Sequence, residues 1–121
     1  MTEVTIVLPP PYRQLSPNAR VHPLTLAKWK ARAKRDAWYA TKEKVIGEPR
    51  WARASVKIVF YHKDNRRRDE DNLIASMKPY IDGIVYAGLI ADDSHKNLIR
   101  LPVEFLIDKE DPRVELVFTR V

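Results

Sequence analysis

The chain contains no cysteine and no long hydrophobic run, and both absences narrow its class. Without cysteine it can form neither a disulfide nor a thiolate metal site, which suits a reducing compartment. The longest apolar run near the N-terminus is VTIVL, too short for a signal peptide or a membrane span. We therefore expect a soluble, cytoplasmic protein that does not act at a membrane.

Acidic residues are scarce in the first half of the chain. Residues 1–68 hold 16 Lys and Arg against 5 Asp and Glu, a balance of +11, whereas residues 69–121 hold 6 against 11, a balance of −5. A basic half favours a polyanionic partner such as nucleic acid, because binding releases counterions. A solvated surface without a ligand explains the same charges equally well.

Periodicity and turn signals predict an alternation of strands and helices. The 121 residues are 45% hydrophobic, which is enough to bury a core and fits a single domain over residues 1–121. Pro79 interrupts the second helical pattern and should kink it near Lys78. The predicted elements are strands at 3–8, 54–62, 97–108 and 114–121, a helix at 24–47 with Thr25 as its N-cap, and a helix at about 72–88. This β-α-β-α-β-β order predicts an α+β fold of two layers, with the helices packed on a mixed sheet.

Two acidic clusters are candidates for chemistry: Asp69, Glu70 and Asp71 in RRRDEDN, and Asp92 and Asp93 in ADDS. Asp69 and Asp71 lie two residues apart where a strand gives way to a helix, and on an extended segment such residues point the same way. Two carboxylates about 4 Å apart repel by roughly 4 kcal/mol at an effective dielectric near 20. Mg²⁺ or Mn²⁺ would relieve that repulsion, and so would the preceding arginines. Acids that cap a helix or lie in a turn give the same pattern without a metal.

Taken together, the residues resemble the RusA-type Holliday junction resolvases, small endodeoxyribonucleases common in prophages. The similarity rests on RRRDEDNL, on YAGLIADDS after the following helix, and on the N-terminal LPPPYRQLSPNARVH. It covers nearly the whole chain, which would then be one RusA-like domain. The resemblance implies a homodimer that cuts two opposed strands of a four-way DNA junction, with Mg²⁺ as cofactor or Mn²⁺ in its place.

The resemblance also implies roles for individual residues. Asp69 and Asp71 match the metal ligands of the Asp-x-Asp motif, Asp93 matches the third acidic ligand, and Asp92 is its neighbour in that motif. The residues that match DNA-contacting positions are Arg66, Arg67, Arg68, Asn72, Asn18 and Arg20.

Members of the family carry a lysine four residues after the second aspartate, where this chain has Ala75. A Lys-Pro pair begins instead at Lys78, seven residues after Asp71. Offsets of four and seven lie on one face of a helix, so Lys78 could point toward the same site. We expect Lys78 to neutralise charge on a phosphate, while Asp69, Asp71 and Asp93 hold one or two Mg²⁺ ions that activate a water molecule.

Two other functions fit part of the pattern. A non-catalytic module would bind DNA phosphates with the basic helix at 24–47, while the acids would only cap the helix at about 72–88. A nucleotide-sugar transferase also uses Asp-x-Asp on a metal, but 121 residues leave little room for donor and acceptor sites. His22, His62 and His95 have no ligand spacing, and we expect the three tryptophans in the core or in a dimer interface rather than against unpaired bases.

Overall fold

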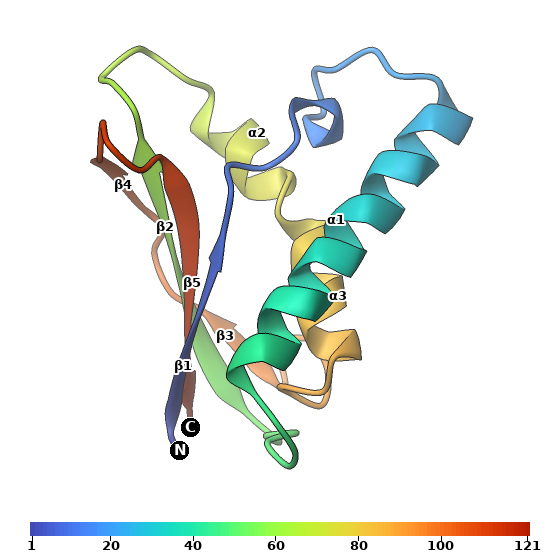
Figure 1. Ribbon diagram of the computed structural model, residues 1–121, viewed down its shortest axis with the longest axis vertical. Coiled ribbons are helices and arrows are strands. Elements are labelled where there is room, and N and C mark those ends of the chain that lie inside the picture. The colour runs from blue at the N-terminus through green and yellow to red at the C-terminus, as the bar shows by residue number, and fades with distance from the viewer.

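The computed structural model describes residues 1–121, and it consists of a five-stranded sheet with helices against one of its faces (Figure 1). Its elements are β1 (Glu3–Leu8), the 3₁₀ turn η1 (Arg13–Leu15), α1 (Pro23–Lys44), β2 (Ala54–His62), α2 (Glu70–Ala75), α3 (Lys78–Tyr86), β3 (Leu98–Arg100), β4 (Glu104–Ile107) and β5 (Arg113–Arg120). The mixed α+β class is confirmed. The predicted order is wrong in two places, because the second helix and the third strand are each divided in two.

The sheet is ordered β1-β5-β2-β3, and β4 pairs with β2 further along the same edge. β5 runs antiparallel to both β1 and β2, whereas β3 and β4 run parallel to β2. The central strand β2 has the bounds that its β-branched and aromatic residues predict. Because β2 lies between β5 and β4, the strands on either side of the KEDPR turn do not pair with each other.

β3 and β4 follow one extended path that a single extra residue interrupts. Ala54 pairs with Leu98, an offset of 44 residues, whereas Val59 pairs with Glu104, an offset of 45. An extra residue on one of two paired strands is a β-bulge. Pro102 lies in this interval and has no N–H to donate, so the predicted strand at 97–108 is broken there.

α1 begins two residues before the predicted N-cap. The Nδ1 atom of His22 accepts a hydrogen bond from the backbone N–H of Leu24 at 3.2 Å, and Pro23 occupies the first helical position. Proline suits that position because its φ is already helical and its missing N–H would have no partner. Thr25 as N-cap is therefore wrong, and the helix ends at Lys44, before Gly47 with its φ of 88°.

The kink predicted near Lys78 is confirmed as a break between α2 and α3. Pro79 cannot donate to the carbonyl of Ala75, so the i to i−4 ladder is lost there. The chain tightens instead, and the N–H of Met77 donates to the carbonyl of Ile74 at 3.1 Å, three residues back. Ser76 and Met77 both keep backbone angles in the right-handed helical region, so no extended residue separates α2 from α3.

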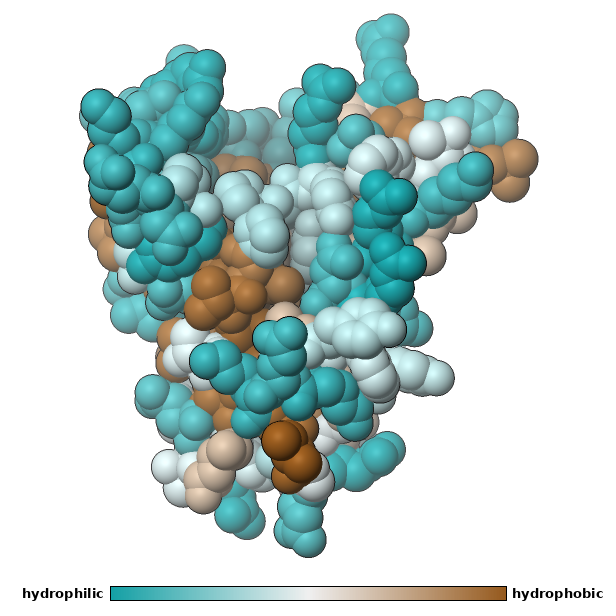
Figure 2. All heavy atoms as spheres, viewed as in Figure 1, coloured by the Kyte–Doolittle hydropathy of each residue, from teal (hydrophilic) through white to brown (hydrophobic).

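The helices bury one face of the sheet, and the core lies between the two layers. Hydrophobic side chains are visible in this layer between strands and helices in Figure 2. α1 and α3 approach closely where Ala33, Ala37 and Gly83 are all buried. None of the helices is long and apolar enough to cross a lipid bilayer.

Candidate functional site

The first acidic cluster lies at the start of α2. Asp69 is the N-cap, and its Oδ1 accepts a hydrogen bond from the backbone N–H of Asn72 at 3.1 Å. Glu70 and Asp71 occupy the first turn, where the partial positive charge of the helix terminus favours acids. Asp71 is exposed and forms no hydrogen bond or ion pair within the chain. Asp69 thus caps a helix, and Glu70 and Asp71 remain exposed to solvent.

The arginines before this cluster do not neutralise it. The guanidinium of Arg68 bonds instead to Asp64, at 2.9 Å from its carboxylate, and to the backbone carbonyls of Asp64 and Arg66. The backbone N–H of Arg66, together with the Arg68 side chain, lowers the pKa of the Asp64 carboxyl. Arg66 and Arg67 are exposed, and no arginine of this run forms an ion pair with Asp69. Arg66 lies 4.0 Å from the Asp64 carboxylate, whereas Arg67 forms no ion pair within the chain. Arg67 is therefore free to bind an external anion, and Arg66 is exposed beside it.

The N-terminal loop comes back against the start of α2. A cavity of about 340 Å³ is lined there by residues far apart in the sequence, among them Arg13, Asn18, Arg68, Asp69 and Asn72. Four of these five were predicted site residues, and the structure brings them together. Arg13 was not predicted, because nothing in the sequence marks it as a partner of the acidic segment.

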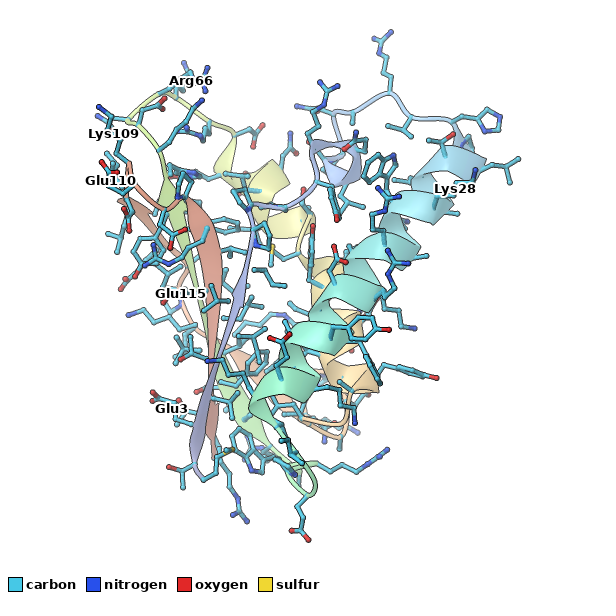
Figure 3. All side chains as sticks on the ribbon, viewed as in Figure 1. Glu3, Lys28, Arg66, Lys109, Glu110 and Glu115 are labelled. Atoms are coloured by element: carbon cyan, nitrogen blue, oxygen red, sulfur yellow. The ribbon has the colours of Figure 1, made fainter.

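Basic side chains flank α2 on both sides at this end of the molecule. Figure 3 shows Arg66 at the tip of the loop between β2 and α2, beside the turn that carries Lys109 and Glu110. Lys28, near the start of α1, lies at the same end of the molecule on the side opposite Arg66. Arg20 is exposed in the loop that precedes α1. A polyanion crossing this end would meet positive charge on either side of Asp69.

The second acidic cluster is joined to Lys78. The ammonium of Lys78, at the start of α3, donates to Asp93 in the following loop and to Oδ1 of Asp82, 2.8 Å away and one helical turn on. The hydrogen bonds that Lys78 donates to Asp82 and Asp93 raise the pKa of Lys78, and the bond it donates to Asp93 lowers the pKa of Asp93. Asp92 forms no ion pair with Lys78, and its Oδ1 accepts a hydrogen bond from the backbone N–H of Asp93 at 2.8 Å.

Asp82, like Arg13, was not predicted from the sequence. It lies four residues after Lys78 on a helix, a spacing that favours an ion pair. That signal was present in the sequence, but it is common on exposed helices and points to no particular site. Asp71 lies on α2, before the break at Ser76 and Met77, and it makes no hydrogen bond or ion pair with Lys78 or Asp82.

The donor chemistry of these acids suits a hard divalent cation. Each of Asp69, Asp82, Asp92 and Asp93 uses one carboxylate oxygen in the hydrogen bonds described, and Asp71 uses neither. The remaining oxygens are the ligands that Mg²⁺ prefers. No group of three or more acidic or histidine side chains converges on one point, however. The metal site therefore stays a prediction, and its ligands would be completed by water or by phosphate oxygens.

The remaining candidates have structural roles. His22 caps α1, and His62 stacks on the ring of Phe105 with centroids 6.1 Å apart. Trp51 is in the core, as predicted, while Trp29 is half-buried against Tyr12.

Comparisons with known proteins give one relative and no family. No family model matches the chain. An uncharacterized protein of Xylella fastidiosa (strain Temecula1) is 35% identical to it over an alignment of 91 residues, and the match covers 69% of this chain. The chain spans about half the length of that relative, 56% of it. The similarity shows that a related sequence exists, and the relative's name assigns no activity.

Proposed function

We propose that this protein is a metal-dependent endodeoxyribonuclease of the RusA type, which acts as a homodimer on four-way DNA junctions. The observation that carries the proposal is the contact between Lys78 and Asp93. The sequence suggested only that the displaced Lys78 could point toward the metal site, and its side chain, at the start of α3, donates a hydrogen bond to Asp93. A helix cap or a plain turn would not require this contact.

The exposed acids support a metal on this surface. Asp71 has both carboxylate oxygens free, and Asp69 and Asp93 each retain one. When bound, Mg²⁺ would supply a Lewis acid for the phosphodiester and lower the pKa of a bound water. Hydrolysis forms a bond from the water oxygen to phosphorus and breaks the bond to one ester oxygen. Lys78 would offset the negative charge that gathers on the phosphate in this step.

The arginines support DNA as the substrate. Arg66 and Arg67 are exposed on a loop beside the acids, and Arg68 holds that loop in shape through Asp64. Guanidinium groups bind phosphate oxygens in a bidentate manner. Two copies of the chain would present two such sites, which symmetric cutting of opposed strands requires.

A non-catalytic DNA-binding module is the second candidate. It is favoured by the cap role of Asp69 and by the absence of three converging acids. In that case the basic residues bind phosphate, and Lys78 with its two acids is an exposed ion-pair network. DNA binding would then not depend on Mg²⁺, and Asp71→Asn would still bind DNA.

The test uses a labelled synthetic four-way junction and a linear duplex of the same sequence, each with Mg²⁺ and with EDTA. Asp71→Asn is compared with the control Glu3→Gln, which removes an exposed acid at the far end of the sheet (Figure 3). We expect paired, Mg²⁺-dependent cuts in the junction by the parent and by Glu3→Gln, and none by Asp71→Asn. Junction binding without cleavage in either Mg²⁺ or Mn²⁺ would support the binding module instead.

A further inference from the structure

A cluster of exposed aromatic rings lies on the outer side of α1 and α3, apart from the acidic residues. Tyr86 is 73% exposed and Tyr39 is 58% exposed. With Trp38 they line a shallow cavity of about 290 Å³, together with Lys34 and Arg35. We call these five residues the aromatic surface. Aromatic rings of this size are usually buried in a core or an interface, so the exposure of these rings needs an explanation.

The rings are combined with positive charge. The ammonium of Lys34 lies 4.8 Å from the centre of the Tyr86 ring, and that of Lys42 lies 5.5 Å from the ring of Trp38. Trp38 and Tyr39 meet edge to face with their centroids 5.0 Å apart. The residues that line the cavity include two cations and no acid. Flat rings with cations beside them match the two parts of a nucleotide, a base with a π-face and a phosphate.

We propose that the aromatic surface binds single-stranded DNA by stacking unpaired bases on Tyr39 and Tyr86 while Lys34 and Arg35 contact the phosphates. Duplex DNA does not fit this description, because its bases are already stacked on one another. A second copy of the chain fits poorly, because a symmetric contact through this surface would bring the cations of both copies together. The like charges would then repel.

The aromatic surface continues into the cavity beside Lys78. That cavity, of about 460 Å³, is lined by Lys78 and Asp82 of α3 and by Ala31 and Lys34 of α1. Ala31 and Lys34 also line the shallow cavity at the aromatic surface. A strand held on the rings would therefore run along α1 toward Lys78. The protein would bind branched DNA that has a single-stranded arm, and the binding itself does not depend on the acidic site.

The test is the binding of a 5′-labelled oligothymidylate of about 20 nucleotides, a length that exceeds the span of one small single-strand site, measured by fluorescence anisotropy in EDTA. We expect Tyr39→Ala and Tyr86→Ala each to weaken binding by about 5- to 150-fold, the range for losing one stacked base. Tyr86→Phe keeps the ring and should bind like the parent. Lys34→Gln should reduce the slope of log K against log salt by about 0.7. The control Lys57→Gln changes a lysine of β2 that pairs with Glu104, and it should leave the slope unchanged.

Three results would overturn the inference. The first is a parent protein that does not bind the oligonucleotide. The second is unchanged affinity in both Tyr39→Ala and Tyr86→Ala, with thermal unfolding showing that both variants are folded. The third is a change of sedimentation coefficient in these variants at unchanged affinity, which would make the aromatic surface a contact between copies. Because EDTA is present throughout, failure of the proposed nuclease activity does not affect any of these outcomes.

Discussion

Replacing Gly83 with alanine should destabilise the protein by about 2 kcal/mol, although alanine is the better helix former. In the helix interior alanine gains about 1 kcal/mol over glycine. A Cβ at this position would, however, fall within the van der Waals distance of the carbonyl oxygen of Lys34, 2.9 Å from its carbonyl carbon and 3.0 Å from the Cβ of Ala37. Two of these three atoms belong to the backbone of α1, so no side chain can rotate to make room.

The helices must separate instead, and the separation weakens the packing between them. A gap of about 1 Å removes a quarter to a half of the dispersion energy of each contact that it opens. Ala33 and Ala37 would lose contacts with α3, and the cost should lie near the upper end of the range of about 1 to 3 kcal/mol for overpacking. Subtracting the gain in helix propensity leaves about 2 kcal/mol.

Urea unfolding followed by circular dichroism measures this difference. With an m-value of about 2 kcal/mol per molar, the midpoint should fall by about 1 M. Gly88→Ala is the comparison, because Gly88 has a φ of 95° but open space around it, so only the backbone penalty of about 1 kcal/mol applies. If Gly83→Ala keeps or raises the midpoint, α1 and α3 are not in the contact described.

Three further predictions concern the acids and a buried tyrosine. Asp69→Ala should cost about 1 kcal/mol by losing the N-cap, whereas Asp69→Asn should keep the unfolding midpoint and still lose Mg²⁺-dependent cleavage, which separates capping from metal binding. Because Lys78 lowers the pKa of Asp93, their pair stabilises the fold above the ordinary Asp value of about 4 and loses this effect as the pH falls through the lowered value. The difference in unfolding free energy between the parent and Lys78→Met should therefore shrink in acid, and a pH-independent difference would contradict the contact. Burial raises the pKa of Tyr80 to about 12, so stability should fall as the pH rises from about 10 toward that value, and Tyr80→Phe should lack this alkaline loss in urea titrations.

Local features were predictable where one short segment decides them. The strand at 54–62 is set by its own β-branched and aromatic residues, and it has the predicted bounds. Pro79 breaks the second helix wherever that helix packs, because the missing N–H is a local property. The N-cap of α1 was not predictable in the same way, because a histidine side chain is an uncommon cap and Thr25 is a common one.

The candidate site was predictable only in part. The acidic motifs and the helical offset of Lys78 from Asp71 pointed to one surface, but the offset did not predict the contact that Lys78 makes with Asp93. Asp82 and Arg13 were missed, since an ion pair one helical turn apart and a loop arginine are both ordinary in a sequence. The aromatic surface was missed as well, because the sequence cannot tell an exposed ring on a helix from a buried one.

The sequence by itself determined the class of fold, the strand at β2, the break at Pro79 and the clustering of acids beside bases. Each of these depends on residues that are neighbours in the chain, so short-range sterics and charge are enough to predict it. The tertiary structure alone decided that β2 separates β4 from β5, that Asn18 lies beside Asp69, and that Lys78 reaches Asp93. These contacts join segments far apart in the chain, and they depend on how the helices pack on the sheet, which no local pattern encodes.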